Sequence, residues 1–312
     1  MNFFLITDKF KLRQIKSYLY MHHIKKIILI VSAFNLLHAK QDNTKLDFQY
    51  KLKKFDALRM YFDIGIGNLV LTPSNNRYIL TSDIHYNPNL KKPTINLSDK
   101  NNIAKLDVKI NPHKNFNKEN SKTLFNNLME DGSDNYKLNF QMPTKISTDV
   151  NFNFGIGKVN LDFTNLRISQ LKMDCGLSDV TMINNKSNIV NCEIVQIETG
   201  VADFNSSGLG NFNASKYVFD IGMGSADIDL SGSINKDCDL KINVSVGSLE
   251  LTLPKNKNIE LKINKNMFSS VNIDGLVSKG EGKYTSKESQ KRWSTIKTEI
   301  SVGLGSLDII VN

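Results

Sequence analysis

A pattern of apolar and small residues recurs seven times along the chain. Each copy is centred on a small residue, taken as position 0, and the seven are Gly65, Gly155, Gly176, Gly200, Gly222, Ser245 and Gly303. From the second copy to the sixth, the spacings are 21, 24, 22 and 23 residues. A period of this length is typical of stacked repeats, because one unit alone cannot bury its apolar face.

The residues before position 0 alternate between apolar and polar. In the fifth copy, for example, Phe219 at −3 and Ile221 at −1 are apolar and Asp220 between them is polar. Position +1 is apolar in every copy: Ile66, Ile156, Leu177, Val201, Met223, Val246 and Leu304. This alternation predicts a strand with one buried face, to which position +1 also belongs.

After position +1 the alternation changes parity. Apolar residues now fall at +4 and +6, as at Leu249 and Leu251, and a straight strand cannot keep +1, +4 and +6 on one face. Position +2 is always small: Gly67, Gly157, Ser178, Ala202, Gly224, Gly247 and Gly305. Glycine tolerates the dihedral angles of a corner, and small residues let successive corners stack closely. Each copy therefore predicts a strand, a tight corner and a second strand.

Stacked bent strands of this kind predict an all-β, single-stranded β-solenoid (β-helix) with a ~22-residue rung and parallel neighbours ~4.8 Å apart. A β-sandwich is the alternative, but it does not require the same corner at equal spacing. The regular stack covers about 152–262. Residues 284–293 predict a short helix or an excursion before the last rung closes the end, and the irregular N- and C-terminal segments predict caps.

Three segments follow from these patterns. Residues 1–40 predict a leader with a signal peptide, in which we expect Met21 to be the true start and cleavage to fall near Ala39 or Lys40. Residues 41–140 predict an N-terminal β region that ends in a polar loop or short helix (113–135), and 141–312 the solenoid, continuous with it as one domain. The apolar run Ile27–Leu37 is shorter than the ~20 residues that span a bilayer, so export to the periplasm or cell surface is favoured over an anchor.

The net charge of +9 does not indicate nucleic-acid binding. Of the 40 basic and 31 acidic residues, the leader holds seven basic residues and one acid, which leaves 33 and 30 for the remainder. Nucleic-acid domains concentrate positive charge on one face or helix. The sequence therefore predicts no nucleic-acid partner.

The sequence contains few candidates for catalysis. After the leader only His85 and His113 remain, and there is no P-loop, G-x-S-x-G or H-E-x-x-H motif. Cys175, Cys192 and Cys238 are an odd number without a C-x-x-C pair, so they predict three buried side chains, with one disulfide and a free thiol as the alternative. We therefore expect no enzyme and no cofactor.

The sharpest chemical candidate is position −2, which points outward. If the rungs stack in order, Asp174, Glu198 and Asp220 form a column of carboxylates at ~4.8 Å spacing. Further acids follow the corner: Asp179, Asp203, Asp227, Asp229 and Glu250. Such a column either recruits a cation such as Ca²⁺ or is a solvated acidic face. Because no rung has the ligand spacing of a calcium-binding repeat, the solvated face is favoured and no metal site is predicted.

Several phrases in order carry a family resemblance. FDIGIGNLVL, DIHYNPNLKKPTI, the run from PTKISTDV to LKMDCG, the run from IETGVADF to DLSGS, and VSVGSLELTLPKN together resemble the toast-rack family of exported bacterial domains. They are also similar to the putative-adhesin β-repeat domains and the C-terminal domain of LiaF-type proteins. The resemblance implies a β-solenoid at the bacterial envelope, with no agreed activity and no catalytic residues to carry over. LiaF-type proteins carry transmembrane helices, which are not apparent here.

These observations predict a non-catalytic envelope module for binding, adhesion or scaffolding. Its expected partner is an envelope protein or a glycan, and self-association through an end strand is a further alternative. Two other functions remain open. One is a regulatory role in an envelope-stress response. The other is a polysaccharide-acting β-helix enzyme that uses the Asp174–Glu198–Asp220 column.

Overall fold

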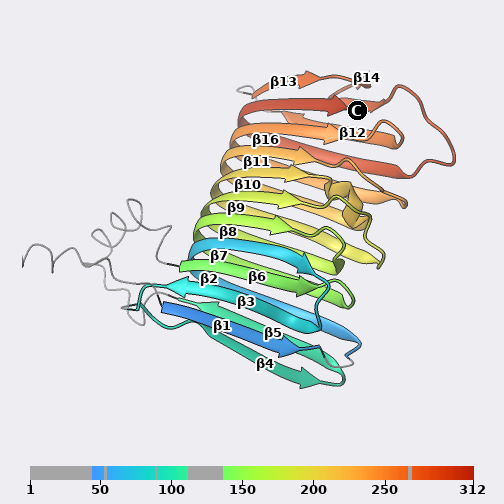
Figure 1. The fold of residues 1–312 in the computed structure, drawn as a ribbon. Coiled ribbons are helices and arrows are strands. Elements are labelled where there is room, and N and C mark those ends of the chain that lie inside the picture. The colour runs from blue at the N-terminus through green and yellow to red at the C-terminus, as the bar shows by residue number, and fades with distance from the viewer. Residues whose placement is uncertain (1–43, 53–54, 89, 112–135, 266–268) are drawn as a thin grey trace, which may run out of the picture. The chain divides into compact units, whose positions relative to one another are not determined.

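The computed structural model describes residues 44–52, 55–88, 90–111, 136–265 and 269–312. The predicted leader, its cleavage site, the polar stretch 113–135 and His113 lie outside the described residues. A single 16-stranded sheet runs through the described chain (Figure 1). No helix in these ranges has the length and apolar character needed to cross a membrane.

Seven long strands form the centre of the sheet. They are β2 (Ala57–Ser74), β7 (Ser147–Asp162), β8 (Arg167–Ile183), β9 (Cys192–Ser207), β10 (Ala214–Asp229), β11 (Cys238–Leu253) and β16 (Thr295–Val311). They lie side by side in that order and all pair in parallel. Each corresponds to one copy of the sequence pattern, so the predicted all-β solenoid is confirmed.

Every long strand bends near its middle, and its two halves face each other across the core (Figure 1). Phe204 in the second half of β9 meets Phe219 in the first half of β10, with ring centroids 6.0 Å apart. Along the first halves, Phe62 and Phe152 stack on neighbouring strands at 4.6 Å. Burial of aromatic and aliphatic residues from both halves is the main term that stabilises the bent sheet.

The small residues at +2 lie at the corners, as predicted. Those residues pair in one column across all seven strands, for example Gly224 with Gly247 and Gly247 with Gly305. The five glycines of the column have φ between +127° and +147°: Gly67, Gly157, Gly224, Gly247 and Gly305. Ser178 and Ala202 complete the column without a positive φ. The corner therefore requires glycine in five rungs and only a small side chain in the other two.

The sequence-based placement of position +1 on the buried face is wrong for most rungs. Ile66 is buried, but the +1 residues of β9, β10, β11 and β16 are exposed to 42% (Val201), 51% (Met223), 45% (Val246) and 54% (Leu304). Because the bend begins at position 0, where the bridge pattern is interrupted, the +1 side chain lies on the outer side of the corner. Strict alternation does not extend into a bend.

At the N-terminal end, the outermost rung is split in two. β5 (Ile103–Ile110) pairs in parallel with the first half of β2, and β6 (Tyr136–Pro143) with the second half. Antiparallel strands extend both layers: β4 (Thr94–Lys100) beside β5, then β3 (Tyr78–Tyr86) beside β6 and β1 (Thr44–Lys51) beside β3. The predicted N-terminal β region is therefore parallel where it meets β2 and antiparallel at its edges.

The C-terminal end departs from the sequence-based prediction. The last strand, β16, lies between β11 and β12 (Asn258–Lys265), so the last rung does not close the end. β13 (Ser269–Ile273) pairs with the second half of β16, and the hairpin of β14 (Leu276–Gly280) and β15 (Lys283–Ser286) extends from β12. The helix considered for 284–293 is absent, because this segment begins as β15 and continues as bends and turns.

Turns on the side opposite the corner return the chain from one rung to the next. The buried side chain of Asn188 donates to the Ile168 and Phe212 carbonyls at 2.7 and 3.1 Å, and its Oδ1 accepts from the Ile168 N–H at 3.2 Å. A short 3₁₀ helix, η2 (Leu209–Phe212), lies in the turn before β10. These contacts satisfy backbone groups where the strand pairing ends.

Candidate binding surfaces

The predicted carboxylate column exists as a geometric feature. Asp174 pairs with Glu198, and Glu198 with Asp220, on the consecutive strands β8, β9 and β10. Asn243 of β11 continues the column, and its side-chain amide donates to Asp220. An amide therefore follows the last carboxylate of the column and stabilises it by hydrogen bonding.

The column borders a shallow cavity of about 330 Å³ beside the corner glycines Gly200 and Gly222. Glu198 accepts a hydrogen bond from the Gln196 amide at 2.5 Å. Within the described ranges, no three His, Cys, Asp or Glu side chains are placed to hold a metal ion. The role of Asp174, Glu198 and Asp220 stays a prediction.

Acidic residues also occupy the outer face after the corner. On β10, burial raises the pKa of Asp227, and the negative charge of Asp229 raises it further. Asp229 accepts hydrogen bonds from the Gly208 N–H at 3.1 Å and the Ser231 N–H at 2.7 Å. Asp203 accepts from the Ser225 hydroxyl at 2.6 Å. Several of these carboxylates therefore fix turns and neighbouring strands.

The exposed +1 residues form a second surface, which we call the corner ridge: Val201, Met223, Val246 and Leu304. They are direct neighbours in the pairing of β9, β10, β11 and β16. Seven large hydrophobic residues are exposed in the described part of the chain, and four of them lie on this line. Because small residues flank each one at 0 and +2, the ridge projects from the corner without neighbouring side chains of its own strand.

The three cysteines are free and buried, so the disulfide alternative is wrong. Burial raises the pKa of each thiol to about 12. A thiol with such a pKa stays protonated at neutral pH and is a poor nucleophile and metal ligand. Cys175, Cys192 and Cys238 therefore act as small apolar side chains of the core.

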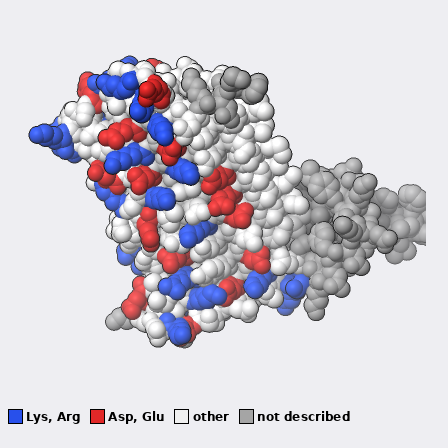
Figure 2. All heavy atoms as spheres, turned by 180° about the vertical axis from the view of Figure 1, so that it is seen from behind, with Lys and Arg blue, Asp and Glu red and all other residues white. Residues whose placement is uncertain are grey.

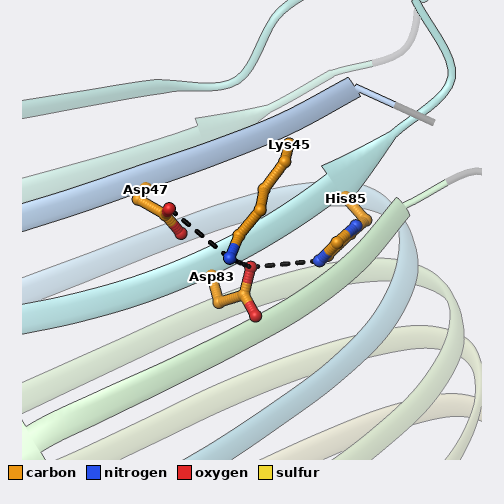
Figure 3. A network of polar contacts seen from close by, with 4 residues as sticks. All are labelled: Lys45, Asp47, Asp83 and His85. Carbon is orange, nitrogen blue, oxygen red and sulfur yellow. Dashed lines mark ion pairs between the residues drawn. The ribbon is translucent and has the colours of Figure 1, made fainter.

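His85 takes part in a network of polar contacts with Lys45, Asp47 and Asp83 (Figure 3). Its Nε2 lies 3.1 Å from Asp83, which also pairs with Lys45 of β1 at 3.5 Å. Asp47 pairs with Lys45 as well, and these two carboxylates raise the pKa of the lysine. The network joins β1 to β3 at an exposed edge, where such pairs stabilise weakly.

The geometry thus defines a class of protein, an all-β solenoid with continuous outer surfaces. A family model described as the N-terminal domain of toast_rack (DUF2154) matches residues 38–207, more than half of the chain. The chain therefore belongs to the toast-rack family, as the ordered phrases indicate. No curated protein matches the sequence.

Several solved structures are similar to this chain at low sequence identity. A putative cell adhesion protein from Clostridium sporogenes is 17% identical, with 86% of this chain and 100% of that chain covered and a TM-score of 0.47. A putative adhesin from Parabacteroides merdae is 10% identical (87% and 97% covered, TM-score 0.36). A putative adhesin from Bacteroides fragilis is 16% identical (86% and 97% covered, TM-score 0.28).

Proposed function

We propose that this protein is an exported, non-catalytic module that contacts a partner protein at the bacterial envelope, in adhesion or as a scaffold. The corner ridge is the observation that supports this proposal. Exposed apolar side chains are normal when scattered singly, but a contiguous line of them is characteristic of a contact surface. Apolar residues of this kind recognise apolar protein surface better than they recognise the hydroxyl groups of a sugar.

Two further observations support the proposal. The family match and the basic, apolar run at Met21–Leu37 favour export of the mature chain. The three thiols lie in the core and His85 lies 3.1 Å from Asp83, so these four side chains do not indicate a reaction site. The carboxylate column lies on the surface, and its presence there does not require that a substrate reacts at it.

A site-specific cross-link in the native host tests this proposal. A photo-reactive amino acid at position 223 of the tagged chain is expected to capture a defined envelope protein, whereas the same residue at Lys186, exposed on a return turn, is not. Fractionation of the same cells reports export. Equal capture from both positions, or recovery of the chain only from the cytoplasm, would contradict the proposal.

A further inference from the structure

A concave groove lies on the outer face of the first strand halves, near the C-terminal end. It has a volume of about 640 Å³. Residues of β10, β11, β16 and β12 line its floor, and residues of β14 and β15 line it on the far side. The groove exists because β16 inserts between β11 and β12 and the β14–β15 hairpin continues beyond them.

Lysines dominate the charged residues of the groove. Six lysines and three acids line it: Lys216, Lys241, Lys262, Lys279, Lys283, Lys297, Asp239, Glu260 and Glu299. Lys262 pairs with Glu299 at 3.6 Å, and Lys283 pairs with Glu281, which does not line the groove. The other four lysines make no ion pair with any described residue. The groove therefore has an excess of positive charge and several ammonium groups available to a ligand.

The strand register orders these charges. Lys216, Asp239, Lys297 and Glu260 are consecutive neighbours across β10, β11, β16 and β12. Lys241, Glu299 and Lys262 follow one another two residues further along the same strands. Figure 2, which views the molecule from behind, shows such mixing of Lys and Arg with Asp and Glu over one face. Lysines thus recur on alternate strands, about 9.6 Å apart, with a carboxylate between them.

The alternation of lysines and carboxylates indicates which kind of ligand the groove can bind. Lysine ammonium groups bind anionic groups as point charges, and carboxylates accept hydrogen bonds from hydroxyls. A polymer with spaced anionic groups and hydroxyls between them can contact both the lysines and the carboxylates. A nucleic acid presents a closely spaced row of phosphates, which would face the intervening carboxylates and be repelled. The neighbouring Tyr284 and Thr285 add polar hydroxyls to the same wall.

We infer that this groove binds an acidic polysaccharide, one that carries carboxylate or sulfate groups along a chain of hydroxyl-bearing sugars. Lys241 and Lys297 on the floor contact the anionic groups, and Asp239 and Glu299 accept hydrogen bonds from hydroxyls. The inference goes beyond the proposed function, since it concerns a different surface and ligand from the corner ridge.

Binding of the full chain to heparin (sulfated) and polygalacturonate (carboxylated) tests the inference, with dextran as the neutral polymer and duplex DNA as the competing polyanion. We expect binding to at least one acidic polysaccharide that weakens with salt, little binding to dextran and weaker binding to DNA. The double variant Lys241→Glu/Lys297→Glu is expected to weaken polysaccharide binding roughly tenfold or more. The matched control Lys158→Glu/Lys186→Glu makes the same charge change at exposed lysines outside the groove and is expected to change it little.

A variant with neutral side chains separates loss of binding from loss of folding if charge reversal disturbs the fold. Lys241→Gln/Lys297→Gln is expected to retain the wild-type melting temperature and to lose most of the polysaccharide binding. Conversely, Asp239→Asn/Glu299→Gln removes two negative charges but keeps acceptor oxygens, and is expected to strengthen DNA binding more than polysaccharide binding. Absence of binding to both acidic polysaccharides, equal loss in the control variant, or preference of the wild type for DNA would overturn the inference. Ridge variants are expected to bind polysaccharide normally, so failure of this inference is separable from failure of the proposed function.

Discussion

The adjacent positions +1 and +2 of the corner differ in how strongly the fold restricts the side chain. At +2, a Cβ added to Gly247 would lie 1.8 Å from the Gly224 carbonyl oxygen, and one added to Gly305 would lie 1.7 Å from that of Gly247. At +1, Val246 and Leu304 are about half exposed. The fold thus requires a small residue at +2 and places little packing demand on +1 in the rungs of the corner ridge. An apolar residue that the fold does not require is a candidate for contact with another molecule.

The largest effect is expected at the constrained position. Gly247→Ala combines a backbone clash with a positive φ of 146° and is expected to lower the free energy of unfolding by roughly 3–5 kcal/mol. Urea unfolding followed by circular dichroism measures this. Gly280→Ala is the matched control, because φ is also positive there (84°) but no atom lies within 4 Å of the added Cβ. Its expected cost is only about 1–2 kcal/mol, and equal costs would refute the steric explanation.

The inner side of the corner can be probed through Cys175, at position −1 of β8. Because burial raises the pKa of its thiol from 9.0 to about 12, native protein at pH 8 is expected to resist thiol reagents that label the unfolded chain.

The unfolded chain loses its thiol protons near pH 9, where the native thiols retain theirs. The three thiols therefore contribute stability that is fully present below pH 9 and is lost as the pH rises toward about 12. The Cys175→Ala/Cys192→Ala/Cys238→Ala variant is expected to show a shallower decline, and an unchanged one would contradict this.

A smaller effect is expected where the corner has no glycine. Ala202 lacks a positive φ, so Ala202→Gly gains no conformational relief and is expected to cost about 0.5–1 kcal/mol through backbone entropy. Differential scanning calorimetry is sensitive enough to measure it. A gain in stability would show instead that the corner of the alanine rung is strained.

The smallest effect on stability is expected on the corner ridge. Since Met223 and Leu304 are half exposed, Met223→Ser/Leu304→Ser is expected to change the free energy of unfolding by less than about 1 kcal/mol. Phe219→Ala, three residues before the corner and fully buried, is the comparison, with an expected cost of roughly 3–5 kcal/mol. A ridge variant as unstable as the core variant would show that the ridge serves packing.

The sequence predicts the bent strand well because glycine spacing and the change of parity are local features. It also predicts the column of Asp174, Glu198 and Asp220, since equal spacing determines which residues become neighbours. Exposure of the +1 residues is not predictable by alternation, because a corner interrupts the period of two. One local signal exists, however: each of these residues is apolar between two small ones.

The position of β16 and the lysine groove depend on pairing between distant segments. Nothing in the residues of 295–311 indicates that they insert between β11 and β12, because parallel neighbours are selected by the whole stack. The lysine groove is likewise not predictable from the local sequence, because it forms between the same distant segments. Lys241 and Lys262 lie on either side of Glu299 because β16 pairs with both of their strands.

The most direct test of the ridge as a contact surface measures stability and contact in the same variant. In the Met223→Ser/Leu304→Ser protein, the photo-reactive residue is moved to Val246, and the free energy of unfolding is measured alongside cross-linking in intact cells. We expect near-wild-type stability together with loss of the cross-linked envelope partner. Undiminished cross-linking in a stably folded variant would contradict it.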